Sequence, residues 1–131
     1  MLDVGKPASE AFHELADAAQ IYLDMLYACD PEMVDDIFEA NARLCTLDGE
    51  TLIYRTVGEY KEVLRSRTPP ASVNAPREDE LISLDLSTPA QALIKIKSRI
   101  NQLVFIDCLS LVRLKQGWRI VAKTYQRISA D

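Results

Sequence analysis

The segment DCLSLVRLKQGWRIVAKTY, residues 107–125, determines the fold that we expect for this chain. Apolar and polar residues alternate on both sides of Gln116-Gly117, which is typical of a β-hairpin. We predict two long strands, from about Asn101 to Lys115 and from Trp118 to Ile128. The hairpin is the last predicted element, and the elements before it determine which of its faces is covered.

Asp107 is the unusual residue of this segment, because it places a carboxylate in an apolar strand. A buried carboxylate without partners costs several kcal/mol or takes up a proton. One interpretation is a pocket group that donates or relays a proton. The other is a structural carboxylate satisfied by hydrogen bonds or by Lys123, Arg113 or Arg119.

The hairpin loop decides which charges share a face with Asp107. A two-residue loop puts Lys115 opposite Trp118 and Asp107 opposite Gln126, so Lys123 points to the other side. A three-residue loop puts Lys123 on the same face as Asp107, because a slip of one residue moves every side chain to the opposite face. We favour the first arrangement, which directs Lys123 away from Asp107.

The chain before the hairpin contains helices and further strands. A run without Gly or Pro predicts a helix that ends near Cys29, and Asp30-Pro31 favours the start of a second, short helix. The other predicted elements are a hairpin at 42–55 that turns at Asp48-Gly49, a helix at 57–67 with a capping box at Thr56 and Glu59, an irregular segment at 68–78 and strands at 80–87 and 91–100. We predict one α+β domain, residues 1–131, in which three N-terminal helices pack on a curved, mostly antiparallel sheet. The irregular segment is either a rim loop of a pocket or a plain surface connection.

The predicted strand at 101–115 is apolar on both faces. An antiparallel sheet in a monomer usually exposes one face to water. Helices cover only one side of the predicted sheet, so we expect a homodimer that packs sheet to sheet.

Composition excludes several classes of function. The chain of 131 residues is 48% hydrophobic and carries a net charge of −5. This charge argues against nucleic acid and against anionic membrane surfaces as partners. We find no signal peptide and no apolar stretch of membrane-spanning length, and we expect a cytoplasmic protein.

The cysteines and the single histidine give little support for a metal site or for a catalytic nucleophile. Cys29, Cys45 and Cys108 are widely spaced in apolar runs, and we interpret them as small buried hydrophobes. His13 is the single histidine, which argues against a zinc site and against a histidine-based triad. We expect no metal and no cofactor.

Two stretches resemble the nuclear transport factor 2-like superfamily. AQIYLDMLYACDPEMVDDIFEANARL, residues 19–44, is similar to its opening of a long helix, a short helix ending in Phe, and a first strand. Residues 107–125 are similar to the putative lumazine-binding subfamily, with an Asp, alternating leucines, a Gly and Trp at the turn, and a later Lys. The resemblance implies a cone-shaped α+β barrel shared with ketosteroid isomerases, scytalone dehydratases and SnoaL-like polyketide cyclases. Because this fold hosts enzymes and non-enzymes alike, the resemblance does not determine an activity.

The resemblance transfers the ketosteroid isomerase site only in part. Its oxyanion-hole tyrosine would fall at Tyr22 and its protonated Asp at Asp107. Its catalytic base would fall at Thr46, which cannot act as one, and Asp48 lies in the predicted turn, where it faces water. The pocket histidines of scytalone dehydratase have no counterpart in these strands.

We therefore predict a small-molecule-binding domain with an apolar cavity whose polar anchors are Tyr22 and Asp107. The residues that we expect at the cavity are Tyr22, Leu26, Phe105, Asp107, Leu109 and Trp118, although Tyr22 and Trp118 also suit plain core packing. One alternative is a cofactor-independent isomerase, dehydratase or cyclase in which Asp107 is the acid or relay and Tyr22 the second catalytic group. Another is a homodimeric protein-interaction module.

Overall fold

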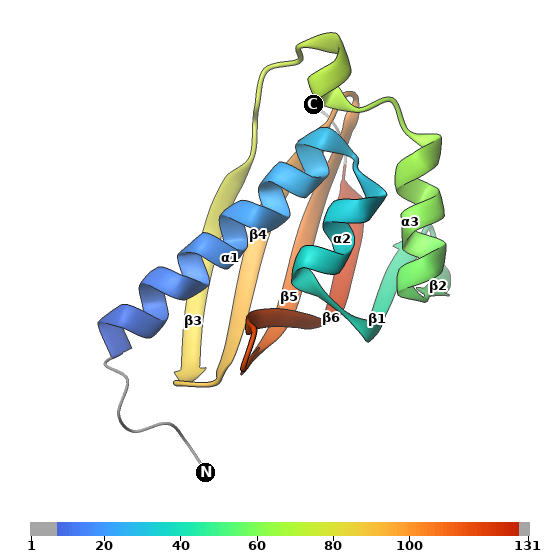
Figure 1. Cartoon of the computed structure of the whole chain (residues 1–131). Helices are drawn as coiled ribbons and strands as arrows, with labels where there is room; N and C mark the ends of the chain where they lie inside the picture. The colour runs from blue at the N-terminus through green and yellow to red at the C-terminus, as the bar shows by residue number, and fades with distance from the viewer. Residues whose placement is uncertain (1–7, 129–131) are drawn as a thin grey trace.

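The computed structural model describes residues 8–128, and within them three helices lie over one face of a six-stranded sheet (Figure 1). The helices are α1 (Ala8–Ala28), α2 (Pro31–Ile37) and α3 (Val57–Ser66), with a short 3₁₀ helix, η1 (Pro70–Val73), after α3. The strands are β1 (Phe38–Asp48), β2 (Thr51–Arg55), β3 (Glu80–Thr88), β4 (Gln91–Ile100), β5 (Leu103–Leu114) and β6 (Gly117–Ile128). The predicted α+β class, with helices on a mostly antiparallel sheet, is confirmed.

The sheet has the order β2-β1-β6-β5-β4-β3, and only the β1–β6 pair is parallel. It curls around the helices without closing, so β2 and β3 form its two edges. The curled sheet therefore has the shape of an open cone, and the helices pack inside it.

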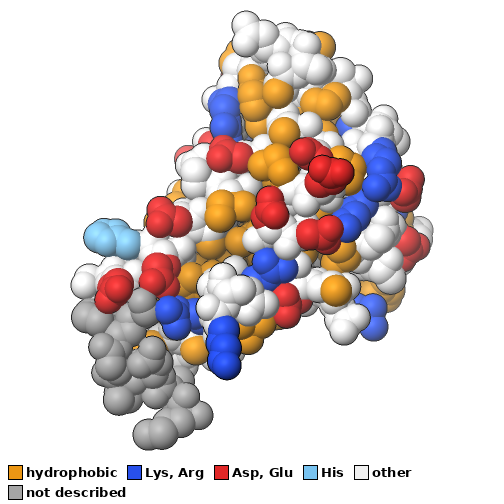
Figure 2. Space-filling model, viewed as in Figure 1, with side chains coloured by type: hydrophobic (Ala, Val, Ile, Leu, Met, Phe, Trp, Pro, Cys, Tyr) orange, Lys and Arg blue, Asp and Glu red, His pale blue; other side chains and the backbone are white. Residues whose placement is uncertain are grey.

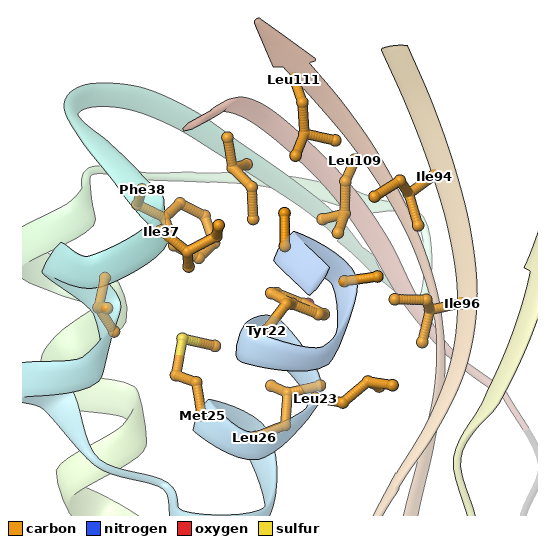
Figure 3. Packing of buried hydrophobic residues seen from close by; sticks show 14 of the residues in the cluster. Tyr22, Leu23, Met25, Leu26, Ile37, Phe38, Ile94, Ile96, Leu109 and Leu111 are labelled. Atoms are coloured by element: carbon orange, nitrogen blue, oxygen red, sulfur yellow. The ribbon is translucent and has the colours of Figure 1, made fainter. Parts of the chain in front are cut away.

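The core lies between α1 and the central strands. Tyr22 of α1 lies between Phe38 and the strand residues Leu109 and Ile96, and Met25 and Leu26 belong to the same buried cluster (Figure 3). Alternate residues of β4 are buried from Ala92 to Ile100, which gives that strand one inner face. Burial of this apolar surface is the main source of stability.

The helical face carries scattered charges, and acidic side chains are prominent among them (Figure 2). The exposed histidine on α1 is His13. Among residues 8–128, no helix is both long and apolar enough to cross a membrane.

The cysteines differ from our interpretation in part. Cys29 is buried and Cys45 is half-buried, but Cys108 is exposed on the outer face of β5. Within residues 8–128, the outward residues of this strand range from buried (Val104) through half-buried (Ile106 and Val112) to exposed (Cys108), so this face is only partly covered. The expected homodimer through this face stays a prediction.

The α3 capping box offers a local test of stability. Thr56 Oγ1 accepts a hydrogen bond from the Glu59 backbone N–H at 3.1 Å, and Glu59 Oε1 accepts one from the Thr56 N–H at 2.9 Å. We expect Thr56→Ala to lower the free energy of unfolding by about 1 kcal/mol in urea denaturation, because the first turn of α3 loses its cap. Thr56→Ser keeps the hydroxyl and should stay close to wild type. Equal losses for both variants would contradict the capping role.

A β-bulge on β6 overturns the predicted arrangement of the last hairpin. Its turn is Lys115-Gln116, so Leu114 pairs with Gly117, whose φ of 114° suits glycine. Pairing then shifts between Leu111, opposite Ile120, and Ser110, opposite Ala122, which leaves Val121 as an extra residue.

The bulge changes which residues of β6 face the helices. Trp118 and Ile120 face inward before it, and Lys123 and Tyr125 face inward after it. Asp107 lies opposite Tyr125, not Gln126, and Lys123 lies diagonally across from it on the same face. The prediction that Lys123 points away from Asp107 is therefore wrong.

Candidate functional site

Asp107 lies on the inner face of β5 with 1% of its surface exposed. Its Oδ2 accepts a hydrogen bond of 2.7 Å from the Tyr22 hydroxyl and a longer one of 3.4 Å from Ser98 Oγ. Its Oδ1 is buried, and no residue from 8 to 128 offers it a hydrogen bond. One oxygen of this carboxylate is thus satisfied by α1 and β4, and the other remains available.

Lys123 is the second buried charge of the site, with 3% of its surface exposed. Its Nζ donates a hydrogen bond of 2.8 Å to the Tyr60 hydroxyl. The same Nζ lies 4.3 Å from the ring centroid of Tyr60, 4.6 Å from that of Tyr125 and 5.1 Å from that of Tyr22. Three aromatic rings therefore lie around the Lys123 nitrogen, and their faces offset part of the cost of burying its charge.

These aromatic rings belong to a continuous series. Phe38 lies between Tyr22 and Tyr60, with ring centroids 6.2 and 5.9 Å away, and Tyr125 lies between Tyr60 and Phe105, at 6.3 and 6.1 Å. The distances are typical of tilted aromatic pairs, which hold one another in place. The rings around Lys123 are thus fixed by packing on α1, α3 and three strands.

Burial governs the protonation of these groups. It raises the pKa of Tyr22 well above its ordinary value, and the Asp107 charge adds to this effect. It likewise raises the pKa of Tyr60. For Lys123 burial lowers the pKa, and the Asp107 charge opposes that shift in part. Both tyrosines stay neutral at physiological pH, while the lysine gives up its proton more readily than an exposed one.

A small cavity lies beside the two buried charges. It measures about 10 Å³, close to the smallest space that holds one water molecule. Its lining consists of Leu26, Tyr60, Arg67, Ser98, Ile100, Phe105, Asp107, Lys123 and Tyr125. Asp107 and Lys123 thus border the same space, although no ion pair of 4 Å or less joins them among the interactions found within residues 8–128.

The cavity collects some of the residues expected from the sequence. Leu26, Phe105 and Asp107 line it, and Tyr22 reaches it through its hydrogen bond to Asp107. Leu109 packs in the core beside the site. Trp118 lies at the other end of β6, in a separate groove beside the hairpin turn.

Several cavity residues were not expected from the sequence. Lys123 and Tyr125 face the cavity because the bulge changes which residues of β6 point inward. Ser98 faces it because alternate residues of β4 point inward. Arg67 comes from the end of α3, where its guanidinium carbon lies 5.2 Å from the Phe105 ring centroid. The signals for Lys123 were the alternative arrangement of the hairpin, its mention among the possible partners of Asp107, and the later Lys of the subfamily pattern.

The isomerase pattern is incomplete at this site. Tyr22 and Asp107 meet as the resemblance implies, but Thr46 takes the place of the base on the inner face of β1. Asp48, two residues further along, is exposed at the end of the strand. Within the part of the chain that is described, no cluster of three or more His, Cys, Asp or Glu residues could hold a metal ion.

The pH dependence of stability tests the state of Lys123, which faces Asp107, Tyr22, Tyr60, Tyr125 and Arg67. An unfolded lysine titrates near a pH of about 10.4. Because the folded pKa is lower, the unfolded chain binds more protons just below that pH, and stability contributed by Lys123 rises as pH increases toward about 10.

We therefore expect the free energy of unfolding of wild type to increase relative to that of Lys123→Met between about pH 8 and pH 10. Tyrosine ionisation in the unfolded state affects both proteins alike and cancels in this difference. Lys95→Met, at an exposed position of β4, is the control and should give a flat difference. A flat difference for Lys123→Met as well would show that burial does not lower the pKa of this lysine.

Comparison with known proteins agrees with this architecture. A family model described as putative lumazine-binding matches residues 10–126. A search of curated proteins found no match.

Solved structures of low sequence identity share the fold. An NTF2-like protein of unknown function from Silicibacter pomeroyi has a TM-score of 0.83 at 16% identity, covering 94% of this chain and 100% of that one. A second from Shewanella baltica has a TM-score of 0.83 at 17% identity, with 94% and 98% covered. A ketosteroid isomerase-like protein from Erwinia carotovora has a TM-score of 0.65 at 15% identity, with 87% and 93% covered.

Proposed function

This chain belongs to the putative lumazine-binding family of the NTF2-like superfamily, and from that premise we propose that it binds a small hydrogen-bonding ligand in the cavity between Asp107 and Lys123. The observation that carries the proposal is the buried Oδ1 of Asp107, which no donor of the described residues, 8–128, reaches. A buried acceptor of this kind costs free energy until a donor reaches it. A ligand with an N–H or O–H group supplies that donor.

Lys123 supplies the complementary half of the interaction. An ammonium group has three N–H donors, and the hydrogen bond to Tyr60 uses one of them. A ligand acceptor near Lys123 and a ligand donor near Asp107 would satisfy both charges at once. Ligands with a donor and an acceptor side by side, such as cyclic imides and amides, have this pattern.

The size of the cavity sets a further condition. A space of about 10 Å³ holds one water molecule, whereas a ring-shaped ligand needs more room. Arg67 is half-buried and lies over Phe105, so its side chain can swing toward solvent without opening the core. We therefore place the entrance at Arg67 and Phe105.

The test compares two ligands with the same ring system, one of which has methyl groups in place of its N–H donors. Lumazine, which the family description mentions, carries ring N–H groups, and 1,3-dimethyllumazine lacks them. We expect calorimetry to detect binding of lumazine and at least tenfold weaker binding of the dimethyl compound. Equal binding of the two would contradict the role of Asp107 Oδ1, and absence of binding by both would contradict this ligand class.

A matched pair of variants locates the site. Asp107→Asn keeps an acceptor for Tyr22 but replaces one carboxylate oxygen by a donor, and we expect it to weaken lumazine binding at least tenfold. Asp85→Asn changes an exposed carboxylate on β3 and should bind like wild type. Circular dichroism of both variants checks that the fold is kept.

A further inference from the structure

Lys123 is the one amine among the residues that line the cavity, where the other polar side chains are Tyr60, Tyr125, Ser98, Asp107 and Arg67. Its Nζ contacts the Tyr60 hydroxyl and three aromatic rings, and it borders the same cavity as Asp107. Within residues 8–128, no carboxylate lies within 4 Å of this nitrogen. A lysine held against apolar surroundings, without a carboxylate in contact, has the environment of a nucleophilic amine.

We propose that Lys123 forms a Schiff base with a small aldehyde or ketone that enters the cavity. The proposal rests on the proposed function, since the cavity must first admit a small molecule. The lowered pKa of Lys123 agrees with it, because a larger fraction of the amine is then free to react. The structure itself places the Lys123 amine beside the cavity and the Asp107 carboxylate at the wall of the same cavity.

The reaction consists of two steps that balance. Nζ of the neutral amine attacks the carbonyl carbon, a C–N bond forms, and the carbonyl π electrons move to oxygen. The nitrogen loses one proton and the oxygen gains one, which gives a carbinolamine. The nitrogen lone pair then expels the hydroxyl group, which takes up a proton from solvent and leaves as water. The products are an iminium group on Lys123 and one water molecule.

Two neighbours assist in different ways. Asp107 has a free oxygen at the cavity and is the group placed to carry the proton from nitrogen to oxygen. Tyr60 is a positioning residue, because its hydroxyl accepts a hydrogen bond from Nζ at 2.8 Å and holds the amine at the cavity wall.

The experiment uses the full wild-type chain with acetaldehyde or pyruvate and cyanoborohydride, which reduces an imine to a stable secondary amine. Peptide mass spectrometry then reports the rate of modification at each lysine. Lys95 and Lys97 are exposed on β4 and serve as internal controls. We expect Lys123 to be modified at least tenfold faster than either of them with at least one of the two carbonyl compounds.

One variant and the binding of lumazine complete the test. Tyr60→Phe keeps the lysine but loses the phenol oxygen, and it should slow modification at Lys123 without changing that at Lys95. Modification of Lys123 no faster than that of Lys95, with both carbonyl compounds, overturns the proposal. If lumazine still binds in that case, the proposed function stands and only the Schiff base is excluded. If neither binding nor modification occurs, both proposals fail.

Discussion

Asp107→Leu should lower the free energy of unfolding by about 3–5 kcal/mol, because it removes one member of a buried network and leaves the others without it. The Tyr22 hydroxyl loses its acceptor at 2.7 Å, and Lys123 loses the negative charge across the cavity. Urea denaturation followed by circular dichroism measures the loss. Asp85→Leu, at an exposed position of β3, should change stability by less than about 0.5 kcal/mol.

The double variant Asp107→Leu with Lys123→Met distinguishes a network from independent contributions. Both charges are then gone, so Lys123→Met should lower the free energy of unfolding by at least about 1 kcal/mol less in the Asp107→Leu background than in wild type. If the losses of unfolding free energy of the two single variants add up to that of the double variant, Asp107 and Lys123 do not interact through the cavity.

Phe38→Ala is expected to destabilise the protein by about 3–5 kcal/mol, because the large ring is only 1% exposed and leaves a cavity in the core. Phe38 begins β1 and lies between the rings of Tyr22 and Tyr60. The matched control is Phe12→Ala on α1, where 41% of the side chain is exposed and the loss should be much smaller. The difference between their denaturation midpoints is the measurement.

A similar loss in the two phenylalanine variants would contradict the position of Phe38 in the core. Phe38 also bears on the site, since it holds Tyr22 and Tyr60 on either side. In Phe38→Ala we expect the tyrosine ring resonances in NMR spectra to broaden, as the two rings gain freedom. Unchanged Tyr22 and Tyr60 resonances would show that the site does not depend on this packing.

The helices, the strands and their arrangement in two layers could be predicted from the sequence. They depend on hydrophobic periodicity and on the residues that start and end each helix. Asp30 and Pro31 start α2, and Thr56 with Glu59 starts α3, as predicted from their side chains. These signals are local, so they do not require knowledge of which strands pair.

The site could be predicted only in part. The inward direction of Asp107 and its contact with Tyr22 followed from strand alternation and from the resemblance. The direction of Lys123 did not, because Ile120, Val121 and Ala122 are all apolar and either arrangement buries apolar residues. Arg67 was missed for a different reason. It enters the cavity from the end of a helix, where tertiary packing alone decides the direction of a side chain.

The extra residue at Val121 bears on how relatives of this chain should be compared. Beyond the bulge, every residue of β6 lies one place out of step with a regular strand, so an alignment that ignores the bulge equates inward residues with outward ones. A relative with a lysine at the same count from the hairpin turn but no bulge would hold that lysine outside the cone. Deleting Val121 from this chain should instead leave a regular strand in which Ala122 follows Ile120 and Lys123 stays opposite Leu109, on the inner face. The chemistry of the interior thus depends on chain length at one point of one strand, as well as on which residues the strand contains.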